Sequence, residues 1–203
     1  MILKQKKINK IILFGGSIIL LEVAKRLKNE KLAIEVFSSN RLLSEIINSN
    51  GSLKTNLNLE KIKYYSTNNI NNCREIKESI TTNSLGIGFG ETWSFNKKII
   101  NQFNGYLIDY MGIPLPRYRG GAHFSWMIMQ NEKNNGACLQ IINEDMIQGI
   151  YDSGEILAEL KFKNNLNWSV NDYFLKQTVI AKKLILKFLK TIHKKDIKGQ
   201  KNY

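Results

Sequence analysis

Cysteine, proline and histidine are scarce in this chain of 203 residues, which contains two of each. Cys73 and Cys138 are too few for a disulfide framework, and neither belongs to a Cys-x-x-Cys pair. Apolar runs such as residues 18–21 are far shorter than the roughly 20 residues that a membrane span needs. No continuous apolar segment follows the first methionine, so we expect no signal peptide. These absences predict a reduced, cytoplasmic protein without a membrane partner.

Acidic residues are also few, with 17 Asp and Glu against 30 Lys and Arg, which gives a net charge of +13. Such an excess attracts polyanions in general. Much of it is lysine in residues 4–10 and 176–201, near the chain ends, and a dedicated nucleic-acid partner is not expected. Apolar residues make up 43% and charged residues 23%, which is typical of a globular domain rather than a disordered chain.

The apolar pattern of the first half predicts alternating strands and helices. Residues 8–14 (INKIILF) predict a strand that ends at Gly15-Gly16-Ser17, a helix follows over 18–27, and residues 33–37 form a second strand. This order opens a parallel sheet with right-handed crossovers. Further strands are expected at 61–65, 85–89 and 105–109, helices at 42–47, 74–80 and 96–103, and a polar loop at 48–58.

The second half of the chain changes character after Asp109. Residues 113–121 hold both prolines, so they predict an irregular loop. A helix at 123–129, strands at 137–142 and 154–160, and a long helix at 171–192 are expected to follow. The predicted fold is α/β: a single Rossmann-like, open and mostly parallel sheet with flanking helices. It comprises one domain, residues 1–192, and a frayed basic tail, residues 193–203.

Two short motifs admit both a structural and a functional interpretation. Gly15-Gly16-Ser17 lies where a Rossmann-type sheet cradles a phosphate, but a glycine pair also serves to turn tightly from strand to helix. Asp152 before Gly154 is equally typical of a turn-forming aspartate. The loop at 113–121 is more informative, because Arg117 and Arg119 offer planar donors at the carboxyl end of a predicted strand.

Leu115-Pro116-Arg117-Tyr118-Arg119-Gly120, with Asp152-Ser153-Gly154 further on, resembles the folate-dependent formyltransferases. The signature of that superfamily is Asn-x-His at a strand end, then Leu-Pro-x-Tyr-Arg-Gly, then Asp-x-Gly. The segment from Gly88 to Gly90, Trp126 and the strand after Gly136 also fall in register, and the resemblance spans roughly residues 8–160. It implies transfer of a formyl group from 10-formyltetrahydrofolate to an amine, with no metal.

The chain departs from the signature at two catalytic positions. Asp109 stands at the position of the family's Asn, and Met111 at that of its His. Methionine cannot exchange a proton, and an ionised aspartate repels a developing oxyanion. General acid–base help is worth about 10²–10⁴ in rate and an oxyanion donor about 10²–10³, so both losses are serious. His123 is a candidate replacement in the same loop region, although a local helix-start role is also open.

The resemblance assigns the candidate residues by role. Catalytic roles are expected for Asp152, His123 and Asp109; substrate binding for Arg117, Arg119, Gly120, Gly121, Gly15 and Ser17; and cofactor binding for Gly88, Phe89, Gly90, Trp93, Met111 and Pro116. Trp93 and Phe95 fit a pterin slot and the core equally well.

The basic composition favours a small phosphorylated amine as the acceptor. Among such amines, an amino sugar carried on a nucleotide is the preferred candidate. Methionyl-tRNA formyltransferases carry a second C-terminal domain, for which little chain follows residue 160, so a truncated relative of these enzymes is an alternative. A second alternative is a non-catalytic or repurposed relative that binds folate or a nucleotide sugar. A polyanion-binding protein on the same scaffold is the weakest option. Homodimer formation is left open.

Overall fold

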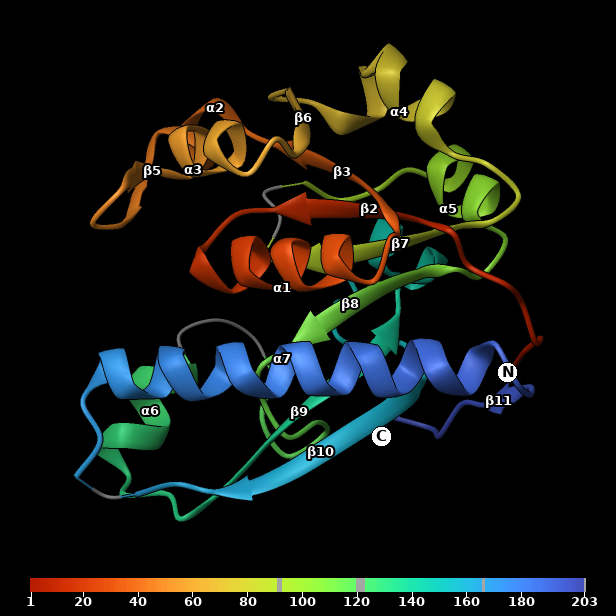
Figure 1. Cartoon of the computed structure of the whole chain (residues 1–203). Helices are drawn as coiled ribbons and strands as arrows, with labels where there is room; N and C mark the ends of the chain where they lie inside the picture. The colour runs from red at the N-terminus through yellow and green to blue at the C-terminus, as the bar shows by residue number, and fades with distance from the viewer. Residues whose placement is uncertain (91–92, 120–122, 166, 203) are drawn as a thin grey trace.

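The computed structural model describes residues 1–90, 93–119, 123–165 and 167–202. Its centre is a seven-stranded sheet in the order β10-β9-β8-β7-β2-β3-β6 (Figure 1). The strands are β2 (Lys10–Gly15), β3 (Ala33–Ser38), β6 (Lys63–Ser66), β7 (Ser84–Phe89), β8 (Leu107–Met111), β9 (Asn134–Ile141) and β10 (Ile156–Lys163). Neighbours from β6 to β8 pair in parallel, whereas β9 is antiparallel to both β8 and β10. The predicted mostly parallel α/β sheet is confirmed.

Helices connect the strands. They are α1 (Ile18–Asn29), α2 (Asn40–Ser44), α3 (Leu53–Leu59), α4 (Arg74–Ser79), α5 (Lys97–Phe103), α6 (His123–Met129) and α7 (Val170–Ile192), with 3-10 turns η1 (Ile70–Asn72) and η2 (Glu144–Gln148). Two small ribbons pair β1 (Ile2–Leu3) with β11 (Ile197–Lys198) and β4 (Ile46–Asn48) with β5 (Gly51–Ser52). No helix in the described ranges has the length and apolarity to cross a bilayer.

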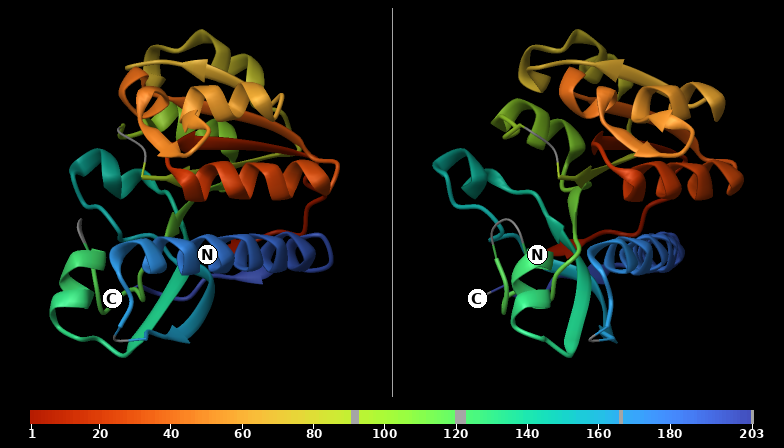
Figure 2. Two further views of the ribbon diagram at one scale, coloured as in Figure 1. Left: turned by 60° about the vertical axis from the view of Figure 1, so that its left-hand side comes forward. Right: turned by 90° about the vertical axis from the view of Figure 1, so that its left-hand side faces the viewer.

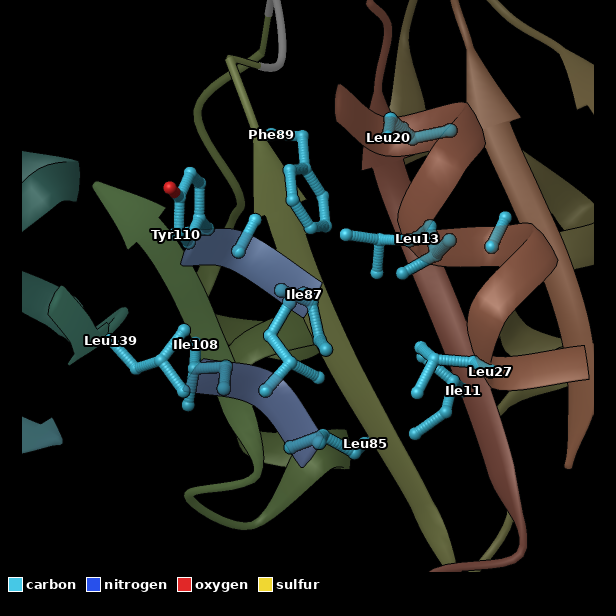
Figure 3. Close-up of a cluster of buried hydrophobic side chains, with 14 of the residues drawn as sticks. Ile11, Leu13, Leu20, Leu27, Leu85, Ile87, Phe89, Ile108, Tyr110 and Leu139 are labelled. Atoms are coloured by element: carbon cyan, nitrogen blue, oxygen red, sulfur yellow. The ribbon is translucent and has the colours of Figure 1, made fainter. Parts of the chain in front are cut away.

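The sheet is covered on both faces, because successive side chains of its strands point to opposite sides. Leu13 and Ile87 lie on the side of α1, in one cluster with its Leu20 and Leu27, and Ile108 of the same cluster lies beside Leu139 (Figure 3). Alternate residues of the same strands belong to the core under α5 on the other face; they include Ile12, Phe14 and Leu107. Helices α1 and α7 lie side by side on the first face, as Figure 2 also shows. A sheet buried on both sides explains the continuous apolar runs of its strands.

The order of strands creates a switch point between β2 and β7. From β2 the chain moves outward through β3 to β6, and then returns to place β7 and β8 on the opposite side of β2. In open α/β sheets, ligands bind in the crevice beyond the carboxyl ends of the strands at such a point. Gly15 and Phe89, the last residues of β2 and β7, therefore mark where a site is expected.

Three parts of the chain differ from the prediction. The helix expected at 42–47 ends at Ser44, and residues 46–48 form β4 instead. The expected loop at 48–58 contains β5 and α3, where Ser52 caps the helix and Leu53 and Leu57 are buried. The expected frayed tail is wrong, because β11 pairs with β1 and Gln200 exchanges main-chain hydrogen bonds with Ile156. The segment that contains α3 is polar and rich in asparagine, so it shows no clear apolar pattern. The C-terminal segment is held by long-range main-chain pairing, which leaves no local pattern in the sequence.

Candidate functional site

A cavity of about 800 Å³ opens beside the carboxyl ends of β2, β7 and β8. Its other walls come from α2, from α7 and from the connection between β9 and β10. The described residues that line it are Gly16, Ser17, Ile19, Arg41, Leu42, Glu45, Phe89, Gly90, Trp93, Ser94, Asp109, Tyr110, Met111, Gly112, Gln140, Ile141, Ile142, Asn143, Met146, Ile150, Tyr151, Asp152, Ser153, Gly154 and Phe174. This volume suits a small organic ligand or two adjacent ones.

Three polar side chains meet at this cavity. Asp109 and Gln140 stand directly opposite each other in the antiparallel pair of β8 and β9, so their side chains share one face of the sheet. The Gln140 side chain donates from Nε2 to Oδ1 of Asp152 at 3.4 Å. Gln140 is buried, whereas both aspartates are half-buried. An uncharged amide thus lies opposite one carboxyl residue in the sheet and donates to the other.

The backbone around Asp152 is fixed by its neighbours. Asp152 has φ +54°, a left-handed conformation that aspartate tolerates better than most residues. Its carbonyl accepts a hydrogen bond from Asn202 Nδ2 at 2.7 Å. At Gly154, an added Cβ would lie 1.7 Å from the carbonyl oxygen of Ile141, so no side chain fits there. The Asp-x-Gly motif thus has a local physical reason: the chain crosses close over β9.

The turn at Gly15-Gly16-Ser17 serves both local structure and the cavity. Gly15 has φ +106°, which favours glycine, and a Cβ on Gly16 would approach Leu42 Cβ to 2.8 Å. Ser17 caps α1, since its Oγ accepts from the Leu20 N–H at 3.3 Å. Gly16 and Ser17 line the cavity, whereas the described lining does not include Gly15.

The segment after β7 forms one wall of the cavity. Phe89 stacks on Tyr110 with ring centroids 5.4 Å apart, and Gly90 follows it with φ +63°. Trp93 lines the cavity, and its indole Nε1 is buried without a hydrogen-bond partner in the described part of the chain. Phe95 instead belongs to the core, where it packs edge-on against Phe14 at 4.9 Å. Gly88 lies within β7 opposite Asp109, outside the described lining.

The loop after β8 differs from the expectation in one respect. Arg117 forms an ion pair with Glu132 at 2.6 Å, and Arg119 donates to the backbone carbonyl of Asn202. Neither arginine is among the described lining residues, and the same is true of the exposed Pro116. Each guanidinium has a partner within the protein, and neither lies on the described cavity lining.

Three candidate positions fall partly or wholly outside the described residues. Gly120 and Gly121 lie outside them. His123 begins α6, but its side chain is likewise outside what the structure describes.

Met111 provides an apolar patch at the end of β8. It lines the cavity and packs against a small core that contains Ile113, Leu115 and Cys138. Burial, with a smaller contribution from the nearby charge of Asp109, raises the pKa of the Cys138 thiol to about 12. Cys138 is therefore a neutral thiol at physiological pH and unsuited to act as a nucleophile.

Charge is distributed unevenly around the cavity. The acidic residues of this part of the lining are Asp109, on β8, and Asp152, in the connection from β9 to β10. The basic residue Arg41 lies on α2 and forms an ion pair with Glu45. Gly16 and Ser17, at the amino end of α1, are on the cavity lining as well. Within the described ranges, no group of three His, Cys, Asp or Glu side chains is placed to hold a metal ion.

We compared the chain with protein families, curated proteins and solved structures. No family model matches the chain. Methionyl-tRNA formyltransferase of Mycoplasmopsis pulmonis (strain UAB CTIP) is 32% identical over 100 residues, which are 49% of this chain and 33% of that protein. The N-formyltransferase of Helicobacter canadensis, solved with folinic acid and dTDP-3-aminofucose, superposes with a TM-score of 0.70 at 16% identity, over 97% of this chain and 68% of that one. Phosphoribosylglycinamide formyltransferase of Bacillus halodurans gives 0.68 at 11% identity, over 91% and 95%.

The chain has the fold of the formyltransferase superfamily. The resemblance inferred from the Leu-Pro-Arg-Tyr-Arg-Gly and Asp-Ser-Gly motifs is therefore confirmed at that level. The matched stretch spans about a third of the length of the curated relative, so substrate and activity are matters for proposal.

Three residues that shape the site carry no role in the motif-based prediction. Gln140 comes from an apolar strand, Arg41 from a short helix, and Asn202 from the predicted tail. A polar residue within the apolar run 137–142 was the available signal for Gln140. No local pattern marks Arg41 or Asn202.

Proposed function

We propose that this chain transfers a formyl group from 10-formyltetrahydrofolate to the amino group of a small acceptor bound in the same cavity. The observation that carries the proposal is the meeting of Asp109, Gln140 and Asp152 at a cavity of about 800 Å³. Such a group of carboxyl and amide side chains can hold an amine, accept its proton and donate to an oxygen that gains charge.

The reaction balances without a further reactant. The amine nitrogen attacks the formyl carbon, the new C–N bond forms, and the carbonyl oxygen carries the charge of a tetrahedral intermediate. The bond to the folate nitrogen then breaks. One proton leaves the amine and one reaches the departing folate nitrogen. The carboxyl groups of Asp109 and Asp152 accept and return protons in this scheme.

In this proposal Gln140 donates the hydrogen bond that stabilises the oxyanion. An ionised Asp109 at that place would repel the developing charge, whereas the Gln140 amide donates a hydrogen bond and carries no charge. Its Nε2 already points toward Asp152, 3.4 Å from Oδ1. A donor of this kind is worth about 10²–10³ in rate. His123, as a further proton carrier at the start of α6, belongs to the same proposal.

The folate donor and the amine acceptor would contact different parts of the cavity lining. Phe89, Trp93 and Met111 offer an apolar surface for the pterin ring of the folate, and the Trp93 N–H can donate to one of its polar atoms. The acceptor would place its amine beside the aspartates. An anionic group of the acceptor would lie near Ser17, at the amino end of α1, and Arg41.

This division of charge supports an acceptor that carries both an amine and a phosphate. An amino sugar linked to a nucleotide meets the requirement, and the N-formyltransferase of Helicobacter canadensis was solved with dTDP-3-aminofucose. The assay uses purified protein, 10-formyltetrahydrofolate and a panel of amino sugar nucleotides, phosphorylated amines and methionyl-tRNA. Release of tetrahydrofolate that depends on one acceptor supports the proposal, and protein that binds no folate overturns it.

A second candidate is a relative that binds the same ligands without transfer. Asp109 and Met111, at the positions of the superfamily's Asn and His, favour it. Saturable folate binding with no tetrahydrofolate released on any acceptor would select this candidate. Turnover on methionyl-tRNA alone would instead select a truncated methionyl-tRNA formyltransferase.

A further inference from the structure

Residues 197–202 form a strap beside β10, and Asn202 of this strap contacts two residues of the cavity lining, Gln140 and Asp152. The N–H of Gln200 donates to the Ile156 carbonyl at 2.8 Å, and the Ile156 N–H donates back at 2.9 Å. Gly199 lies so near Glu155 that an added Cβ would be 2.1 Å from its Oε2. The strap is therefore fixed to the start of β10, directly after the Asp152 turn.

Asn202 links three separate parts of the site. The residue is only 2% exposed, and its Nδ2 donates to the Asp152 carbonyl at 2.7 Å and to Gln140 Oε1 at 3.4 Å. Its backbone carbonyl accepts from the Arg119 guanidinium. The turn at Asp152, strand β9 and the proline loop thus converge on one residue.

The contact with Gln140 decides which way its amide points. Oε1 accepts from Asn202, so Nε2 is left to face Asp152. An amide that could rotate freely would present the oxygen, which cannot donate, about as readily as the nitrogen. Holding the carbonyl of Asp152 also supports its left-handed backbone, since an unusual conformation persists when its surroundings over-determine it.

We propose that Asn202 is a positioning residue for this cavity, and that Arg119 acts by holding Asn202 rather than by binding a ligand. Asn202 keeps the Asp152 turn against β9 and orients the Gln140 amide. The structural role of Asn202 is independent of the proposed function, whereas its effect on turnover rests on the proposed formyl transfer.

Hydrogen exchange of the full chain tests the structural part. Asn202→Ala is expected to speed exchange of amides in residues 140–156 about tenfold, as the loss of the buried hydrogen bond to the Asp152 carbonyl predicts, and to leave α1 unchanged. Gln200→Ala is the matched control, because Gln200 is exposed and its main-chain pairing with Ile156 needs no side chain. Wild-type exchange in Asn202→Ala, or an equal rise in both variants, overturns the proposal.

Asn202→Asp keeps the shape and makes the contact depend on pH. A protonated carboxyl group can donate to the Asp152 carbonyl, whereas an ionised one cannot. Exchange in residues 140–156, corrected for its intrinsic pH dependence, should approach the wild-type value near pH 3, where an aspartic acid with a pKa of about 3.9 is mostly protonated, and depart from it at pH 8. Asn202→Ala should show no such recovery. If the two variants match at every pH, the donor role of Asn202 is excluded.

Turnover tests the remaining part once an acceptor is known. Asn202→Ala should lower kcat about tenfold with the KM for the folate donor changed less than twofold, and Gln200→Ala should match the wild type. An unchanged kcat contradicts the catalytic part. If the wild-type protein transfers no formyl group, the proposed function fails, and the exchange experiments still decide the role of Asn202.

Discussion

Tyr110 donates its phenolic hydrogen to Gln177 Oε1 at 2.6 Å, which joins the end of β8 to the long helix α7. Gln177 in turn donates from Nε2 to the carbonyl of Gly112 at 2.9 Å. Both side chains are buried, and burial raises the pKa of Tyr110 far above its ordinary value. The position of Asp109 and Met111 on this strand therefore depends on a contact with a helix from the far end of the chain.

Tyr110→Phe should lower the free energy of unfolding by about 1–3 kcal/mol, because it leaves the buried Gln177 oxygen without its donor. Urea denaturation measures the change. Tyr64→Phe is the control, since Tyr64 is only half-buried. Equal stability of Tyr110→Phe and the wild type would show that the hydrogen bond contributes nothing net.

Gly154→Ala should destabilise the protein by about 1–3 kcal/mol or more and displace the Asp152 turn. The cause is the 1.7 Å approach of the added Cβ to the Ile141 carbonyl, which the backbone must relieve. Thermal unfolding and folate binding measure the two effects. Glu159→Ala, at an exposed position of β10, should be close to neutral, and a neutral Gly154→Ala would contradict the crossing described here.

Gln140→Leu should reduce formyl transfer about 10²–10³-fold if its amide stabilises the oxyanion. Binding of the folate should change little, because the pterin wall is formed by other side chains. Tetrahydrofolate release measures the rate. Gln148→Leu, on the exposed side of η2, serves as the control, and a Gln140→Leu variant with wild-type kcat removes the amide from the mechanism.

His123→Ala should abolish turnover and leave the thermal unfolding temperature unchanged, since the proposal makes His123 a proton carrier. His193→Ala offers a contrast. Its Nε2 accepts from the Ile8 N–H at 3.0 Å, so its loss should reduce stability rather than activity. Unchanged turnover in His123→Ala would leave proton transfer to the aspartates alone.

Glu35 should make stability depend on pH. Burial by itself would raise the pKa of Glu35, but contacts with Ser79, Lys10 and Lys63 outweigh it and lower the pKa below its ordinary value. A carboxyl with a lowered pKa stabilises the fold above its unfolded-state pKa, and this contribution is lost as the pH falls through the folded-state value. Glu35→Gln should cost about 1 kcal/mol at pH 7 and progressively less below about pH 4.5. A cost that is independent of pH, or equal to that of the exposed Glu30→Gln, would contradict this.

The fold was largely predictable because its patterns are local. The apolar strands, the glycine turn before α1 and the spacing of α6 and α7 all depend on neighbours within a few residues. The helix at Leu53–Leu59 escaped prediction because its core contacts are two leucines in an asparagine-rich segment. The site was predictable only in part: Asp109, Met111 and Trp93 line the cavity, whereas Arg117 and Arg119 point to partners within the protein.

By itself the sequence determined the α/β sheet and the likeness to the formyltransferases, since periodicity and short motifs are written in consecutive residues. Only the tertiary structure decided which polar groups meet at the cavity. Gln140 and Asn202 are 62 positions apart, and Asp152 and Asn202 are 50 apart. Contacts over such separations arise from strand register and chain crossing, which bring side chains together only after the sheet has formed.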